Sequence, residues 1–254
     1  MRENLTVTWI GTGTCVPRLD RRGPCTLVRG GGVAAAVDLG LGALHGLLGE
    51  GIRHADVDAV LLTHLHPDHV TELAPFLFAA NYDEEPREKP LELVGGPGVA
   101  AFVAALAAAH GRWLEPKRYE LRLHELRPGE ELYLGELRCR TGAVRHIASS
   151  LAFRLELGGR SLVLSGDTGP SPELEEFARD ADVLVLEASL PPAATMAEHL
   201  TARQAGELAR AAGAGRLVLN HVYPSADRAD AQRLAEAAFL ASVWVARDGL
   251  RMEL

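Results

Sequence analysis

The sequence predicts a layered α/β sandwich, in which two strand-rich halves pack together and carry helices on the outside. Two observations predict this fold class. Short apolar or alternating runs bounded by Gly and Pro recur along the 254 residues, and segments with helical spacing separate them except between about 119 and 167, where nearly everything reads as strand. No linker, internal repeat or low-complexity segment is evident, so we expect residues 1–254 to form one domain.

The expected strands are the runs whose apolar residues alternate or cluster over a few positions. In order, they lie at residues 5–11, 33–40, 57–64, 91–96, 119–126, 136–146, 150–159, 160–167, 182–189, 216–221 and 242–249. Turn residues in the segments 127–130 and 156–161 separate neighbouring strands.

The expected helices lie at 97–111, at 201–213 and around 227–240, where apolar residues recur every three to four positions. Thr201 can cap the second of these, with Gln204 reaching back in a capping box. Residues 68–82 also read as a helix, which Pro75 should interrupt or kink.

Composition excludes several classes of protein. The chain is 47% hydrophobic and 24% charged, with a net charge of −8 and no basic stripe, so the electrostatic footprint of a nucleic-acid binder is missing. No stretch is long and apolar enough for a signal peptide or membrane span, and we expect a cytoplasmic protein. The three cysteines form no CxxC pair and should be reduced packing residues.

The segment THLHPDH at residues 63–69 places four candidate metal ligands directly behind an apolar run. At the end of a strand, His64 and His66 point the same way and suit one ion, while Asp68 and His69 lie on the following turn and can address a second point nearby. Imidazole and carboxylate ligands without thiolates favour zinc, with manganese or iron as alternatives. The alternative is that these are surface histidines in a loop, an interpretation that suits a single His better than this cluster of four candidate ligands.

Two ions need further ligands, and polar residues at other strand ends supply candidates. His146, Asp167 and His221 each follow apolar strand positions, and strand ends converge in layered α/β folds. Asp167 has two carboxylate oxygens and could bridge two ions about 3.5–4 Å apart. Taken singly, each of the three could instead be an ordinary polar residue at a strand end.

THLHPDH, followed by His146, SGDTG and His221 in that order, resembles the metallo-β-lactamase fold superfamily over most of the chain. GTGTCVPRLDRRGP, LEAS and EHLTARQAGELARAAGAGRLVLNH are similar to its ribonuclease Z and related phosphodiesterase branch. The resemblance implies a four-layer αβ/βα sandwich of two mixed β-sheets. It also implies His64, His66 and His146 on one ion, Asp68, His69 and His221 on the other, and Asp167 between them.

The same resemblance gives a role to His199, which stands in the sequence HLT before the helix that starts near residue 201. A helix N-terminus favours an anion such as phosphate, so we expect His199 to contact a phosphoryl oxygen or to protonate the leaving group. Glu187 could orient His199, or could be an ordinary strand end. A solvent-facing loop histidine is the alternative for His199.

The expected function is metal-dependent hydrolysis of a phosphodiester by a hydroxide held between the two ions, with Asp68 as a proton acceptor. Bacterial ribonuclease Z proteins typically carry a long arm between their equivalents of His146 and Asp167, and only IASSLAFRLELGGRSLVLSG stands there in this chain. With the negative net charge, this favours a small substrate such as a cyclic nucleotide or short oligonucleotide over long structured RNA.

Several alternatives remain open from the sequence. The same dinuclear centre could hydrolyse a lactone, thioester, β-lactam or sulfate ester. A metal-binding regulator without turnover is less consistent with seven ligands, and a redox di-iron role is less consistent with His at position 66. The resemblance also suggests a homodimer. Asp38 is expected to stabilise the loop around the metals as a strand-end residue, and GTG at 11–13 to form a tight loop.

Overall fold

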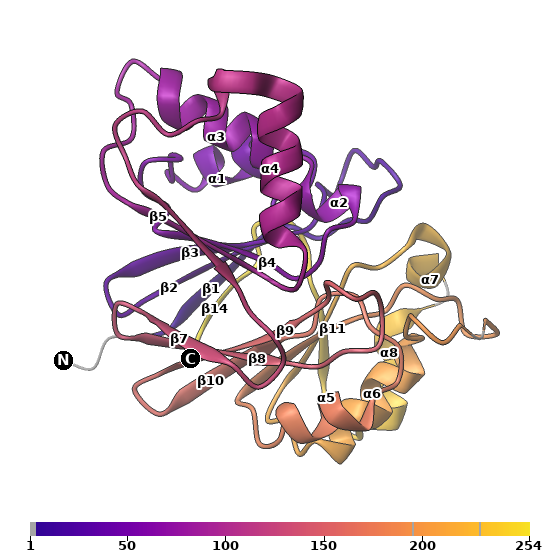
Figure 1. The fold of residues 1–254 in the computed structure, drawn as a ribbon. Helices are drawn as coiled ribbons and strands as arrows, with labels where there is room; N and C mark the ends of the chain where they lie inside the picture. The colour runs from indigo at the N-terminus through magenta and orange to yellow at the C-terminus, as the bar shows by residue number, and fades with distance from the viewer. Residues whose placement is uncertain (1–3, 195, 229) are drawn as a thin grey trace.

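Two seven-stranded β-sheets lie face to face at the centre of the molecule, each covered by helices on its outer side (Figure 1). The structure is a computed structural model that describes residues 4–194, 196–228 and 230–254. This architecture confirms the predicted four-layer αβ/βα sandwich.

The first sheet has the order β14-β1-β2-β3-β4-β5-β6, and its strands β3 to β6 run parallel. In chain order its strands are β1 (Thr6–Gly11), β2 (Cys25–Gly30), β3 (Val33–Val37), β4 (Ala59–Leu62), β5 (Leu91–Gly95), β6 (Leu121–Glu125) and β14 (Arg251–Glu253). The C-terminal strand β14 therefore returns to pair with β1 at the other end of the sequence.

The second sheet has the order β13-β12-β11-β10-β9-β8-β7, with β10 to β13 parallel. Its strands are β7 (Glu131–Leu134), β8 (Leu137–Gly142), β9 (Ala152–Leu157), β10 (Arg160–Leu164), β11 (Val183–Glu187), β12 (Leu217–Asn220) and β13 (Val243–Val245). The predicted turn at 127–130 separates β6 from β7. Of the predicted turn at 156–161, only Gly158 and Gly159 lie outside β9 and β10.

The helices fall on the two outer faces because their apolar sides pack on opposite sheets. The first sheet is covered by α1 (Ala43–Gly49), α3 (Leu73–Tyr82) and α4 (Val99–His110), and the second by α5 (Pro172–Phe177), α6 (Ala202–Ala211) and α8 (Ala231–Phe239). The remaining helical elements of the described residues are short: α2 (Pro67–Val70), α7 (Pro224–Arg228) and the 3₁₀ turn Gly111–Trp113. None of the described helices is long and apolar enough to cross a membrane.

Apolar side chains fill three layers of core. One lies between the sheets and includes Trp9 and Phe153, and the other two lie between each sheet and its helices. Strand β4 is buried at all four positions because both of its faces are covered, which explains its continuous apolar run.

Several details differ from the sequence-based expectations, and strands β2, β7 and β14 were not among the expected strands. The segment 68–82 breaks at Thr71 and Glu72, whereas Pro75 lies in the first turn of α3, where a backbone N–H has no partner within the helix in any case. Cys25 and Cys139 are buried packing residues, but Cys15 is exposed and its Sγ lies 3.1 Å from the Tyr223 hydroxyl. The capping box of Thr201 and Gln204 is present as predicted.

Candidate metal centre

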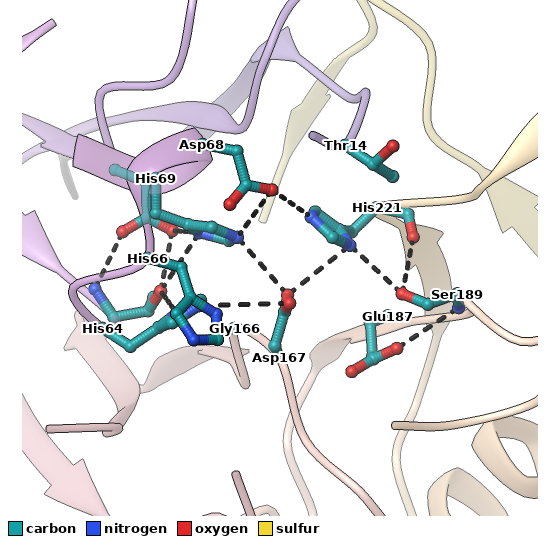
Figure 2. A network of polar contacts seen from close by, with 12 residues as sticks. Thr14, His64, His66, Asp68, His69, Gly166, Asp167, Glu187, Ser189 and His221 are labelled. Carbon is teal, nitrogen blue, oxygen red and sulfur yellow. Dashed lines mark hydrogen bonds and ion pairs between the residues drawn. The ribbon is translucent and has the colours of Figure 1, made fainter. Parts of the chain in front are cut away.

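The candidate ligands meet where strands of both sheets end (Figure 2). His64 follows β4, Asp167 follows β10 and His221 follows β12, while His146 lies in the loop after β8. Because the parallel strands of each sheet all end on the same side, side chains far apart in the sequence reach one place. All seven predicted ligands lie in this cluster.

One group of donor atoms consists of His64, His66, His146 and Asp167, whose ligand atoms lie within 4.8 Å of one another. His146 Nε2 lies 3.1 Å from His66 Nδ1, and His64 Nε2 lies 4.0 Å from Asp167 Oδ2. His146 Nδ1 donates to the backbone carbonyl of Glu198 at 3.1 Å, so its Nε2 lone pair faces His66.

A second group consists of Asp68, His69 and His221, again with ligand atoms within 4.8 Å of one another. Asp68 Oδ2 lies 3.3 Å from His221 Nε2 and 3.8 Å from His69 Nε2. Asp68 and His69 are carried by α2, whose first residue, Pro67, ends the extended segment that presents His66.

Asp167 lies between the two groups. Its Oδ2 faces His64, and its Oδ1 lies 3.5 Å from His69 Nε2 and 3.5 Å from His221 Nδ1. The preceding Gly166 has φ +60°, and an added Cβ there would lie 2.6 Å from Thr63 Cβ. Only glycine therefore allows β10 to end close enough to β4 for Asp167 to reach the cluster.

The chemistry of the cluster fits metal ions. His64 Nε2, His69 Nε2 and Asp167 Oδ1 are buried and have no hydrogen-bond partner in the part of the chain that the structure describes. Atoms bound to one ion at about 2.0–2.2 Å lie up to about 4 Å apart, which is close to the spacing within each group. Divalent cations would satisfy these buried atoms.

Asp38 and Thr63 contact the Nδ1 atoms of two of the imidazole rings, on the edges opposite the candidate ligand atoms Nε2. Asp38 accepts hydrogen bonds from His69 Nδ1, from the Thr63 backbone N–H and from Thr63 Oγ1, each at 2.8 Å. Thr63 Oγ1 donates its only proton to Asp38, so it accepts from His64 Nδ1 at 3.1 Å. Both rings are thereby fixed with their Nε2 lone pairs toward Asp167.

Charge and burial shift the acid–base properties of the cluster in different directions. Burial, together with neighbouring imidazoles, lowers the pKa of His64. Burial also opposes protonation of His69, but the carboxylates of Asp38 and Asp167 outweigh it and raise the pKa of His69. Burial works against ionisation of Asp167, yet His221, His69 and His64 together hold its pKa well below the usual value.

His199 lies beside the cluster and is held by Glu187. Its Nδ1 lies 2.8 Å from Glu187 Oε1 and 4.0 Å from Asp167 Oδ2, and its ring centroid is 4.9 Å from that of His146. The hydrogen bond to Glu187 raises the pKa of His199. The contact that the predicted orienting role of Glu187 requires is thus present.

Three backbone N–H groups around the start of α6 are hydrogen-bonded within the protein. The backbone N–H of Leu200 donates to Glu187, that of Thr201 to Gln204, and that of Gln204 to Thr201. Of these three donors, only the Gln204 N–H belongs to the first turn of α6, so these contacts leave the anion expectation for this helix N-terminus as a prediction.

Comparison with known proteins identifies the family. Residues 42–222 match the model of the beta-lactamase superfamily domain. The chain belongs to the beta-lactamase superfamily. The ribonuclease Z of Mycobacterium marinum is 34% identical over 243 residues, covering 86% of each chain. This member of the superfamily is therefore a metal-dependent hydrolase of the ribonuclease Z-like type.

Solved structures agree with this fold. The metallo-beta-lactamase fold protein YhfI of Bacillus subtilis superposes with a TM-score of 0.86 at 24% identity and full coverage of both chains. A diphosphatase from the PhnP family superposes with a TM-score of 0.74 at 20% identity, covering 100% of this chain and 98% of its own.

Sequence reasoning missed the residues that orient the ligands. Thr63 was visible as the first residue of THLHPDH, and Asp38 was expected only to stabilise the loop. Asp38 precedes His69 by 31 positions, so their pairing depends on the parallel packing of β3 and β4. A carboxylate at the end of the neighbouring strand was the available signal.

We expect the superfamily member to bind two divalent ions per chain and to lose stability without them, because the ions satisfy buried atoms that otherwise lack partners. Elemental analysis measures the ions, and calorimetry before and after chelation measures the melting temperature. The melting temperature should fall on chelation and recover when zinc is added. An unchanged melting temperature with no bound ion would refute the metal centre.

Replacing Asp38 by Asn should weaken metal binding by about 10–100-fold, because an amide is a weaker acceptor for the His69 ring. Competition with a chromophoric chelator measures the affinity. Asp58→Asn is a matched control, since Asp58 accepts the Ala34 backbone N–H at the other end of the same strand pair. Equal affinities in the two variants would remove Asp38 from the orienting role.

Proposed function

We propose that this hydrolase cleaves phosphodiester bonds in small substrates such as a cyclic nucleotide or a short oligonucleotide. The observation that carries the proposal is the juxtaposition of two ligand groups, linked by Asp167, with a histidine that is not needed as a ligand. His199 lies at the edge of the first group, 4.0 Å from Asp167 through its Nδ1. A proton donor beside two cations suits the departure of an alkoxide from phosphorus.

In this proposal each ligand group would hold one ion. His64, His66 and His146 would hold the first ion, Asp68, His69 and His221 would hold the second, and Asp167 would serve both. When bound, the two cations make water acidic near neutral pH and neutralise charge that develops on the phosphoryl oxygens. Zinc is the ion that we propose for this imidazole and carboxylate set, with manganese or iron as alternatives.

The protein side chains divide the proton transfers between them. Asp68 Oδ2 faces the imidazoles, while its Oδ1 takes part in no contact within the cluster and can accept the proton of the attacking water. His199 uses Nδ1 to donate to Glu187, which leaves its Nε2 to contact a phosphoryl oxygen or to protonate the leaving group.

A cavity beside Asp68 supports a small substrate. It has a volume of about 580 Å³, within the range of about 300–1,000 Å³ that is typical of small-molecule sites. Arg18 and Arg22 line it, but they pair with Asp20 and Asp248. Arginines with carboxylate partners attract an extended phosphate backbone less than free ones would.

Cleavage of a structured RNA is a second candidate, favoured by the similarity to ribonuclease Z over 86% of both chains. The alignment is longer than the part of this chain that it covers, so the relative has residues with no counterpart here. Between His146 and Asp167 the present chain has only the hairpin β9–β10. The two candidates share one reaction and differ in how much substrate contacts the protein.

A panel of substrates distinguishes these functions. The zinc-loaded protein should hydrolyse bis(p-nitrophenyl) phosphate and a cyclic nucleotide or short oligoribonucleotide faster than a lactone or thioester, and the metal-free protein should be inactive. A precursor transfer RNA with a 3′ extension tests the second candidate. Preference for a carbonyl substrate would refute phosphodiester hydrolysis.

His199→Ala should lower kcat by about 10²–10⁴-fold, because the leaving group loses its proton donor, while two ions remain bound. Steady-state kinetics and elemental analysis measure the two effects. His45→Ala is the control, because His45 is exposed on α1. Unchanged turnover in the His199 variant would exclude it from the reaction.

A further inference from the structure

Ser189 lies directly behind His221, outside the set of residues assigned so far (Figure 2). It follows β11 and is 4% exposed. Its Oγ lies 3.1 Å from His221 Nδ1 and 3.1 Å from the His221 backbone oxygen. One hydroxyl therefore contacts both the ring and the main chain of a single candidate ligand.

The hydrogen-bonding capacity of these atoms determines where the protons lie. A carbonyl oxygen can only accept, so the single Ser189 hydroxyl proton is donated to the His221 carbonyl. Ser189 Oγ then accepts from His221 Nδ1, which must carry the ring proton. His221 Nε2 is left with its lone pair and faces Asp68 Oδ2 at 3.3 Å.

The backbone of His221 also needs support. Its φ is +50°, in the left-handed region that a residue with a Cβ rarely adopts because the backbone is strained there. The hydrogen bond from Ser189 to the His221 carbonyl helps to hold this conformation. Without it, both the peptide and the ring of His221 would have more freedom.

The position of Ser189 is itself fixed by the protein. Its backbone N–H donates to Glu187 Oε2 at 3.2 Å, and the neighbouring Ala188 N–H donates to the Asn220 carbonyl at 3.1 Å. Since Glu187 and Asn220 are paired in the register of β11 and β12, Ser189 is held before any ion binds.

We propose that Ser189 is a positioning residue for the second ion, fixing the tautomer and backbone of His221 so that Nε2 is presented to the metal. This rests on the dinuclear centre of the proposed function. A purely structural role, in which Ser189 only satisfies a buried carbonyl, would change the stability of the fold and leave metal affinity unaltered.

The test compares zinc affinity in three variants by competition with a chromophoric chelator. Ser189→Ala should weaken one of the two zinc sites by about 10–100-fold, and Ser189→Thr, which keeps the hydroxyl, should retain both. Ser161→Ala is the matched control, because it removes another buried hydroxyl, one that contacts Asp182 at the far end of β10. Circular dichroism and denaturant unfolding of the metal-free proteins check that each variant folds.

Wild-type affinity at both sites of a folded Ser189→Ala variant would overturn the proposal, as would an equal loss in a folded Ser189→Thr variant. The readout is independent of the substrate. If the wild-type protein binds two zinc ions but cleaves no phosphodiester, the proposed function is refuted. The zinc affinities of the Ser189 variants then still decide whether Ser189 positions His221. A wild-type protein that binds fewer than two ions would refute both.

Discussion

The centre depends on the burial of ligand atoms that no group in the described chain satisfies. His64 Nε2, His69 Nε2 and Asp167 Oδ1 are all buried without a hydrogen bond. Leaving one such group unsatisfied costs about 1–3 kcal/mol, and a typical domain is stable by only about 5–15 kcal/mol. Three unsatisfied groups would together cost much of the stability of such a domain. The rings cannot turn away to find partners, because hydrogen bonds on their opposite edges hold them. A cation is the natural complement of this arrangement, so folding and metal binding are coupled here.

Local patterns predicted the layers of the fold. They also predicted that the seven candidate ligands lie at one edge, because the ligand segments follow apolar strands. The alternation of strands with helices implies the direction of these strands. The groups behind the ligands could not be predicted in this way. Asp38 precedes His69 by 31 positions and Ser189 precedes His221 by 32, so each pair meets only through strand pairing. The strand β14 was missed for a similar reason, since three residues carry almost no periodic signal and pair with β1 across the whole chain.

Glu187 connects the two flanks of the centre. Its Oε1 accepts from His199 Nδ1 and the Thr168 N–H, and its Oε2 accepts from the N–H groups of Ser189 and Leu200. Four donors on two oxygens offset part of the cost of burying this carboxylate, and burial still raises the pKa of Glu187. One group therefore sets the position of His199 beside one ligand set and of Ser189 behind His221 in the other.

Reaction and substrate are determined by different parts of this structure. The ligands stand at the ends of strands packed on both faces, where a substitution disturbs the core, whereas the cavity beside Asp68 is walled largely by the loop of residues 14–23. Loops can change in sequence with little effect on packing, and many substrates can therefore share one set of strand ends. An identity of 34% over most of the chain therefore assigns the hydrolase family without determining the substrate. Under the proposed function, the paired arginines and apolar side chains of that loop would contact the group attached to phosphorus.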